Sequence, residues 1–240
     1  MKKKINISIE ARMESTRLPG KTLKLINHKP ALEIMVNRVK QTKLANNIII
    51  ATTSKKKDDQ IINWCNLNNL DYFRGSENNV YDRVVETHEK FNTDIIVELT
   101  GDCILITAEL IDRAIQIYLE NKYDCVAVTD PSGMGAQVYS LKTLQSIKNF
   151  KKLEYTDREH VTPYLYSSGK YKVSKTTMYN NLGCPEVSLP LDTIEDWKLI
   201  DNICKNFDNF NFSFEDIIEY IKKNPEIISI NSHIKRKGLN

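Results

Sequence analysis

The stretch KINISIEARMESTRLPGKT, residues 4–22, decides the fold expected for this chain. Residues 4–9 form a short β-type run, and residues 10–20 directly after it are polar and rich in turn-forming residues. A strand that passes at once into such a loop is a common start for the parallel sheet of an α/β protein. We therefore expect the loop to be flexible and to lie at the carboxyl end of the first strand.

Outward from this stretch, strand-like and helix-like segments alternate through the first half of the chain. Strand patterns occupy residues 47–53, 71–73, 95–99 and 123–128, and helical patterns occupy residues 30–44, 58–68, 80–91 and 108–121. Alternation of this kind is typical of a mostly parallel central sheet flanked by helices. The expected fold class is α/β, with ligands bound at the carboxyl ends of the strands.

The second half of the chain is less regular. Strand patterns are expected at residues 136–141 and 171–178, and helices at residues 156–167, 194–205 and 214–222. No internal repeat and no low-complexity linker interrupts the chain. We expect a single domain over residues 1–240, from which residues 136–185 project as a small lobe for the acceptor or for dimerisation.

Composition excludes several classes of function. The chain has 34 Lys and Arg residues against 31 Asp and Glu, a net charge of +3, which argues against a dedicated nucleic-acid binder. No apolar run approaches the roughly 20 residues that span a bilayer. Five scattered cysteines without a C-x-x-C pair argue against a local zinc site and favour reduced thiols in the cytoplasm. These cysteines are Cys65, Cys103, Cys125, Cys184 and Cys204.

The first loop carries three cations, Arg12, Arg17 and Lys21. Placed at the carboxyl end of a strand, they can neutralise a triphosphate together with backbone N–H groups. Gly20 allows the backbone to come close to a ligand, and Pro19 stiffens the turn. A solvated basic loop is the alternative, and three cations within ten residues make it the weaker one.

A second alternative for this loop is the P-loop, G-x-x-x-x-G-K-[ST]. Gly20, Lys21 and Thr22 match its end, but Ser15 replaces the first glycine, and Pro19 removes one donating N–H group. We therefore expect Lys21 to contact phosphates without a P-loop around them. Replacing Thr22 with alanine is expected to cost little, since no metal should depend on its hydroxyl.

Two carboxylates are candidates for a metal site. Asp102 follows the strand at residues 95–99 on a turn at Gly101, and Asp192 precedes the helix at residues 194–205. Mg²⁺ takes one or two protein carboxylates and completes its octahedron with phosphate oxygens and water. From the sequence alone, these carboxylates could equally well have structural roles. Asp192 could be the N-cap of the helix, and Asp102 could be a turn residue, and each of these roles is about as well supported as metal binding.

The run A-R-M-x-S-T-R-L-P-G-K at residues 11–21 resembles the nucleotide-binding loop of the cytidylyltransferase family. That family includes the Kdo and acylneuraminate cytidylyltransferases and the SpsF-type spore-coat polysaccharide branch, which is the most similar. Supporting blocks occur in order at residues 50–53 (IATT), 75–77 (GSE), 82–83 (DR), 99–103 (LTGDC), 158–164 (REHVTPY) and 191–196 (LDTIED). The resemblance implies a Rossmann-like nucleotidyltransferase fold, a homodimer, and Mg²⁺ as the cofactor.

The resemblance also implies roles for individual residues. It favours metal binding for Asp102 and Asp192, and it makes Arg12 and Lys21 the other catalytic groups. Asp196, one helical turn after Asp192, is either a support for the site or a helix-start charge. The nucleotide-binding set is Ala11, Arg12, Arg17, Gly20, Lys21, Thr52, Thr100 and Gly101. The acceptor-binding set is Arg83, Gln137, Arg158, Glu159 and His160.

Three residues depart from the family pattern. Glu98 stands where arginine is frequent, Ile104 replaces a proline, and Gln137 replaces an acidic residue. All three fall on the side expected for the acceptor, and they leave the identity of the acceptor open.

The function expected is Mg²⁺-dependent transfer of a nucleoside monophosphate, CMP from CTP, to a sugar-type acceptor with release of pyrophosphate. The product would be an activated sugar for a surface polysaccharide. The alternatives are a guanylyl- or other nucleotidyltransferase acting on a sugar 1-phosphate or a small phosphorylated acceptor, a P-loop small-molecule kinase, and a non-catalytic nucleotide-binding protein. Neither nucleic acid nor membrane is expected as a partner.

Overall fold

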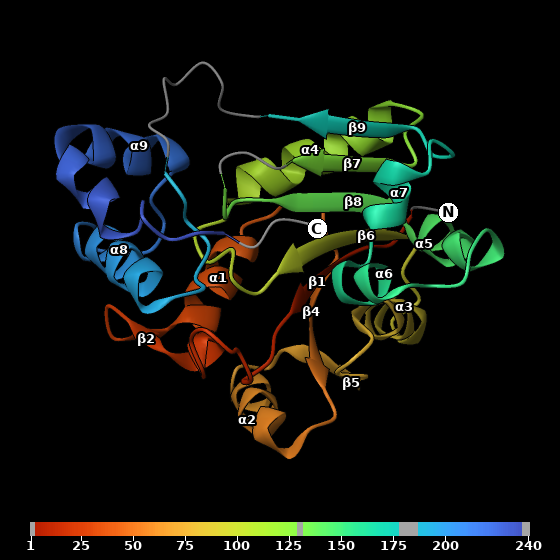
Figure 1. Cartoon of the computed structure of the whole chain (residues 1–240), viewed down its shortest axis with the longest axis horizontal. Helices are drawn as coiled ribbons and strands as arrows, with labels where there is room; N and C mark the ends of the chain where they lie inside the picture. The colour runs from red at the N-terminus through yellow and green to blue at the C-terminus, as the bar shows by residue number, and fades with distance from the viewer. Residues whose placement is uncertain (1–2, 129–131, 178–186, 237–240) are drawn as a thin grey trace.

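The computed structural model describes residues 3–128, 132–177 and 187–236. Within these residues a seven-stranded sheet crosses the molecule, and helices cover both of its faces (Figure 1). The strands of the sheet are β1 (Ile5–Glu10), β4 (Asn47–Thr53), β5 (Asp71–Gly75), β6 (Ile95–Thr100), β7 (Cys125–Val128), β8 (Ala136–Ser140) and β9 (Val173–Thr176). The α-helices are α1 (Ala31–Val39), α2 (Asp59–Leu67), α3 (Val80–Lys90), α4 (Ala108–Glu120), α5 (Leu141–Ser146), α6 (Tyr155–His160), α7 (Pro163–Ser167), α8 (Ile194–Lys205) and α9 (Phe214–Lys223).

The strand order is β5-β4-β1-β6-β8-β7-β9. Strands β5, β4, β1 and β6 run parallel, whereas β8 pairs antiparallel with both β6 and β7, and β7 pairs parallel with β9. The sheet is therefore mostly parallel, as the alternation in the first half predicts. The carboxyl ends of β5, β4, β1 and β6 meet at one edge, and the loops that leave them lie side by side.

The two faces of the sheet differ because the sequence of β1 alternates between apolar and polar residues. Ile5, Ile7 and Ile9 belong to the larger core cluster, to which α1, α2, α4, α8 and α9 contribute. Asn6 and Ser8 are buried on the opposite face, since successive strand residues point to opposite sides. A smaller core cluster under α3, α5 and α7 covers that second face. The second face is therefore partly polar beneath its helices.

Most of the expected elements are confirmed, and the bounds of β4 and α8 coincide with the prediction. The single helix expected at residues 156–167 is wrong, because two helices, α6 and α7, occupy that stretch. Val161 between them has φ 62°, and Pro163 is the first residue of α7, where its missing N–H costs no hydrogen bond.

A small hairpin precedes α1 and was not expected from the sequence. Strand β2 (Leu25–Ile26) pairs with β3 (Lys29–Pro30), and α1 therefore begins only at Ala31. The two turn residues, Asn27 and His28, have φ of 42° and 67°. A two-residue turn of this kind normally carries Asn-Gly, and the pair Asn-His gives a weak signal.

The segment expected to form a lobe begins inside the sheet. Strand β8 lies between β6 and β7, and β9 forms an edge of the sheet. The end of the strand expected at residues 171–178 and the residue Cys184 lie outside the described residues. A separate role for residues 136–185 in acceptor binding or dimerisation stays a prediction.

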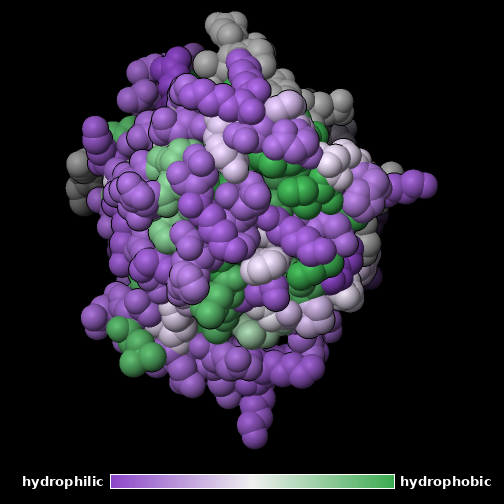
Figure 2. Space-filling view, turned by 90° about the vertical axis from the view of Figure 1, so that its left-hand side faces the viewer, coloured by the Kyte–Doolittle hydropathy of each residue, from purple (hydrophilic) through white to green (hydrophobic). Residues whose placement is uncertain are grey.

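The surface on the side of α8 and α9 is mainly hydrophilic, with small and separate hydrophobic patches (Figure 2). Among the described residues, no helix has the length and apolar character needed to cross a membrane.

Candidate active site

The loop after β1 is held in one shape by hydrogen bonds. Gly20 has φ 73°, a conformation that favours glycine, and its N–H donates to the Met13 carbonyl at 2.9 Å. The buried hydroxyl of Thr22 donates to the Arg12 carbonyl at 2.8 Å, and the Met13 N–H donates to the Asp58 carboxylate at 2.7 Å. These hydrogen bonds make the loop a braced platform, and its flexibility stays a prediction.

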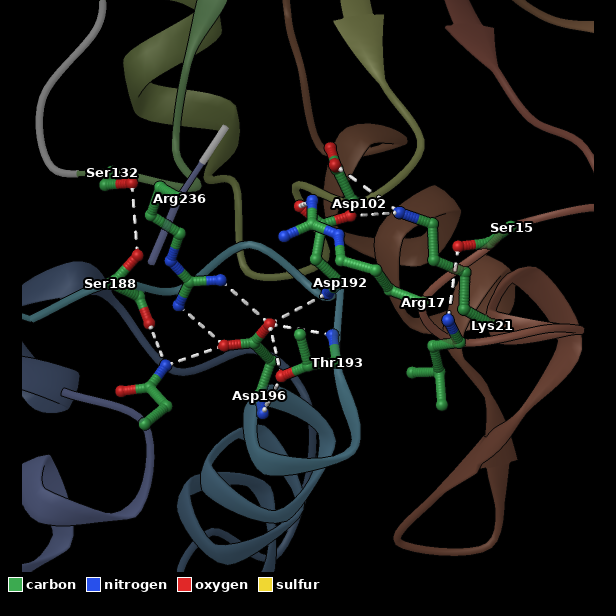
Figure 3. A network of polar contacts seen from close by, with 12 residues as sticks. Ser15, Arg17, Lys21, Asp102, Ser132, Ser188, Asp192, Thr193, Asp196 and Arg236 are labelled. Atoms are coloured by element: carbon green, nitrogen blue, oxygen red, sulfur yellow. Dashed lines mark hydrogen bonds and ion pairs between the residues drawn. The ribbon is translucent and has the colours of Figure 1, made fainter. Parts of the chain in front are cut away.

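Two carboxylates and two cations from distant parts of the chain meet at the carboxyl edge of the sheet (Figure 3). Lys21 Nζ lies 2.7 Å from Asp192 Oδ1 and 3.5 Å from Asp102 Oδ2. Arg17 Nη2 lies 2.8 Å from Asp192 Oδ2. Both carboxylates therefore point toward the same ammonium group, and four of the residues expected in the site are brought together.

The backbone fixes the two carboxylates next to each other. The Leu191 N–H donates to the Asp102 carbonyl at 2.9 Å, which joins the loop after β6 to the segment before α8. The Gly101 N–H donates to the Glu10 carbonyl at 3.0 Å. A Cβ at residue 101 would lie 2.5 Å from that carbonyl oxygen, and only glycine fits there.

The N-cap of α8 is Thr193, whose hydroxyl accepts from the Asp196 N–H at 3.2 Å. The alternative role of Asp192 as an N-cap is therefore excluded. The carboxylates of Asp192 and Asp102 are engaged with Lys21 instead, and both side chains are about one-fifth exposed. They remain accessible to a ligand.

The other residues expected to bind the nucleotide lie on β4, on β6 and in the loop after β1. The Ala11 N–H donates to the Ala51 carbonyl, which extends the pairing of β1 with β4 into the loop. The Arg12 side chain is exposed and makes no hydrogen bond or ion pair with the described residues. The hydroxyl of Thr52 is buried without a partner among those residues, and the Thr100 hydroxyl contacts Cys103 Sγ at 3.2 Å.

The residues expected to bind the acceptor fall into two groups, and neither group contacts the carboxylate cluster within the described residues. Arg83 is buried and donates to the Ser76 carbonyl at 2.6 Å. Gln137 Oε1 accepts from Thr162 Oγ1 at 2.6 Å and from the Tyr166 hydroxyl at 2.5 Å. The second group consists of Arg158, Glu159 and His160, which are exposed on α6.

Helix α6 nevertheless lies within electrostatic reach of the first loop. The pKa of Tyr155 is raised, chiefly by its hydrogen bond to Glu159, and the charge of Arg12 acts in the opposite direction. The charge of Arg12 therefore reaches the first residue of α6.

The cytidylyltransferase family profile matches residues 7–212, most of the chain and all of the site described above. The chain belongs to the cytidylyltransferase family. It is accordingly an enzyme of the nucleotidyltransferase class, EC 2.7.7. Members of this class typically use a divalent metal ion.

Individual relatives agree with the family. The spore coat polysaccharide biosynthesis protein SpsF of Bacillus subtilis is 33% identical over 225 residues, which cover 91% of this chain and 94% of that protein. A cytidylyltransferase structure from Leptospira borgpetersenii is 33% identical, covers 98% of this chain and 100% of that one, and superposes with a TM-score of 0.90.

A more distant structure shares the fold. CMP:2-keto-3-deoxy-manno-octonic acid synthetase, solved as a complex with CTP, has a TM-score of 0.65 at 18% identity and covers 85% of this chain and 99% of that one. The nucleotidyltransferase fold that the first loop predicts is confirmed.

The cytidylyltransferase loop also differs from a P-loop in its geometry. A P-loop passes into a helix, whereas residues Lys21–Leu23 form one 3-10 turn before the β2–β3 hairpin. In a P-loop the hydroxyl after the lysine binds Mg²⁺, whereas the Thr22 hydroxyl donates to the backbone carbonyl of Arg12. Both observations argue against the kinase alternative.

The sequence marks Glu98 as a departure from the family pattern but did not predict that its side chain is buried near that of Glu10. Glu98, on β6, is 5% exposed and accepts a hydrogen bond from the Tyr139 hydroxyl. Glu10 Oε1 accepts from the Ser8 hydroxyl at 2.9 Å, and Glu10 Oε2 is buried without a partner among the described residues. The alternation of isoleucine with polar residues in β1 was the available signal for a buried polar face.

The pKa values of both acidic side chains are raised. Burial, followed by the charge of Glu98, raises the pKa of Glu10 well above its usual value. Burial raises the pKa of Glu98 to about 7, and its hydrogen bond to Tyr139 opposes the rise.

The departures from the family pattern are also placed by the structure. Glu98 and Gln137 are direct partners in the β6–β8 ladder. Two of the three departures therefore form one neighbouring pair. Ile104 is fully buried in the larger core, and its departure concerns packing.

Replacing Glu98 with glutamine is expected to stabilise the protein at pH 8 but to have little effect at pH 4.5. A carboxyl group whose pKa is raised on folding stabilises fully below its unfolded pKa, and that contribution is lost as pH rises through about 7. The difference in the free energy of unfolding should grow to about 1–3 kcal/mol across this window. Denaturant unfolding at several pH values measures it.

Glu86→Gln, on the exposed side of α3, is the matched control and should show no such growth. A constant difference between Glu98→Gln and the wild type from pH 4.5 to pH 8 would contradict the raised pKa of Glu98.

Proposed function

We propose that the chain transfers CMP from CTP to a sugar-type acceptor, with Mg²⁺, and releases pyrophosphate. One observation carries this proposal: the carboxylates of Asp102 and Asp192 converge on one cationic group, the Lys21 ammonium, beside the braced loop after β1. Carboxylates and cations at one edge are what a metal-bound triphosphate requires.

The donor set fits Mg²⁺. Two carboxylates that already share one cation, Lys21 Nζ, can share a metal ion, and no group of three or more His, Cys, Asp or Glu side chains suited to a metal occurs in the described part of the chain. Mg²⁺ is typically held by one or two carboxylates together with phosphates and water, whereas structural Zn²⁺ needs four protein ligands. Asp102 and Asp192 would hold the ion, which neutralises charge on the phosphates.

The cations of the loop would exchange partners when the nucleotide binds. Lys21 and Arg17 are paired with Asp192 in the structure, and phosphate oxygens would replace the carboxylate as their partner. Arg12, which is exposed and has no such pair among the described residues, is available for phosphate from the start. These groups bind and orient the triphosphate, and the braced loop keeps them in place.

In the reaction, an oxygen of the acceptor bonds to the α-phosphorus of CTP, and the bond between that phosphorus and the α,β-bridging oxygen breaks. Pyrophosphate leaves with the bonding electrons. A sugar 1-phosphate acceptor loses no proton, whereas a hydroxyl acceptor releases one to solvent or to a base.

The acceptor proposal rests on the family and on residues of α3, β8 and α6. Arg83, Gln137 and the exposed end of α6 are proposed to bind the acceptor. The name of the Bacillus subtilis relative supports a sugar of a surface polysaccharide as the acceptor. Because Glu98 replaces a frequent arginine next to Gln137, we propose an acceptor with fewer anionic groups on this side. A homodimer is part of the proposal, and light scattering after size exclusion tests it.

CTP is expected to raise the melting temperature more than GTP, ATP or UTP at equal concentration with Mg²⁺. Binding to the folded state stabilises it by mass action, by about 2.7 kcal/mol at a hundred times Kd, which shifts Tm by several degrees. Pyrophosphate release from each triphosphate, with keto-sugar acids and sugar 1-phosphates as acceptors, then gives kcat/KM. A preference for GTP would replace CMP transfer with guanylyl transfer, and ADP formation from ATP would favour a kinase.

A further inference from the structure

Asp196 is a fully buried carboxylate in the first turn of α8. Its Oδ2 accepts from the backbone N–H of Asp192 at 3.1 Å and from the N–H and hydroxyl of Thr193 at 2.8 and 3.0 Å. Asp196 therefore fixes the peptide that carries the Asp192 carboxylate.

The other side of Asp196 is held by the segment that follows the 3-10 helix at Pro225–Ile230 (Figure 3). Arg236 grips both carboxylate oxygens, with Nη1 2.9 Å from Oδ2 and Nη2 2.6 Å from Oδ1. Asn231 Nδ2 donates to Asp196 Oδ1 at 2.8 Å and to the Ser188 carbonyl at 2.7 Å. Burial alone would raise the pKa of Asp196, but the hydrogen bonds from Arg236 and Asn231 outweigh it and lower the pKa. Asp196 is therefore a charged centre that joins the peptide before α8 to one distant segment, residues 231–236.

We propose that Arg236 is a positioning residue for the metal–nucleotide site, acting through Asp196 on Asp192. This inference rests on the proposed function, since it takes Asp192 to be a metal ligand. Among the described residues, Arg236 binds the Asp196 carboxylate and makes no direct contact with the Asp192 carboxylate. Sites of this kind need their ligands held within about 0.5 Å, and supporting groups are typically worth 10- to 100-fold in metal affinity.

A purely structural role must be separated from a positioning role. Removing the guanidinium leaves Asp196 as a buried carboxylate without its cation, and this destabilises the fold whether or not Asp192 moves. A drop in melting temperature alone therefore decides nothing. The readout has to be the affinity of the site for a divalent ion, measured well below the melting temperature.

The experiment titrates Mn²⁺ into the CTP-saturated protein and follows free Mn²⁺ by electron paramagnetic resonance. Arg236→Met is expected to weaken Mn²⁺ binding about tenfold or more. Arg236→Lys keeps the charge but loses the bidentate contact with Asp196, and its Mn²⁺ affinity should lie between those of Arg236→Met and the wild type. Lys205→Met breaks another ion pair of α8, to Asp201 at 2.6 Å, and should leave Mn²⁺ affinity unchanged.

A double-variant cycle shows whether the effect passes through Asp192. In the Asp192→Asn background, Arg236→Met should have no further effect on Mn²⁺ affinity. Wild-type Mn²⁺ affinity in both Arg236 variants would overturn the inference and leave the proposed function intact; if Arg236→Met does not fold, Arg236→Lys decides. If the wild type with CTP binds Mn²⁺ no more tightly than CTP alone, the metal site itself is wrong, and the inference falls with it.

Discussion

Asp192→Asn is expected to lower kcat for CMP transfer by about a thousandfold or more while the protein stays folded. The amide keeps the shape of the side chain but loses the charge that would face the metal ion. The cap of α8 is unaffected, because Thr193 makes it. Pyrophosphate release at saturating Mg²⁺ measures the loss, and circular dichroism checks the fold.

Asp208→Asn, at an exposed position after α8, serves as the matched control and should retain full activity. Near-full activity of Asp192→Asn at saturating Mg²⁺ would show that the metal assignment is wrong. The same replacement at Asp102 should behave like that at Asp192, since Lys21 Nζ lies within 3.5 Å of both carboxylates.

Lys21→Ala is expected to lower kcat/KM by about 10²- to 10⁴-fold, because a charge-assisted contact to phosphate is lost in a partly shielded site. The side chain of Lys21 is 16% exposed, so water replaces it poorly. Steady-state kinetics with CTP measures the effect. Lys24, the next lysine in the chain, lies over the Trp197 ring, and Lys24→Ala is a control that should retain activity.

The neighbouring Thr22 changes one expectation taken from the sequence. Its buried hydroxyl braces the loop through the Arg12 carbonyl, and Thr22→Ala should therefore cost about tenfold in kcat/KM by loosening the platform. Thr22→Ser keeps the hydroxyl and should recover most of this loss. Metal affinity should stay at the wild-type value in both variants. A fall in metal affinity in Thr22→Ala, as large as the fall in activity, would indicate a P-loop after all.

The parallel half of the fold could be predicted because each strand and helix carries its own periodic pattern. Residues 47–53 are the example, since the apolar run there is buried on both faces. The position of β8 could not be predicted, because strand order depends on contacts between residues far apart in sequence. The break between α6 and α7 was signalled by Pro163 but was outweighed by the helical pattern around it.

The residues of the candidate site were likewise only partly predictable from the sequence. Asp102 and Asp192 could be selected as candidates because the family motifs mark them, one after β6 and the other just before α8, and their metal-binding role stays a prediction. The burial of Glu10 near Glu98 was not predicted, because the alternation in β1 indicates only a polar face, and the pairing of β1 with β6 is what brings the two acidic side chains together. Arg236 is 40 residues from Asp196 in sequence, and only the packing of the segment after α9 brings it to the site.

We propose that Asp102 and Asp192 bind a divalent ion together with CTP. Isothermal titration of CTP into the protein, with and without Mg²⁺, is the most direct test of this site. Mg²⁺ should tighten CTP binding about tenfold or more in the wild type and have little effect in the Asp102→Asn, Asp192→Asn double variant. Equal dependence on Mg²⁺ in the two proteins, or no binding of CTP to the wild type, would contradict it.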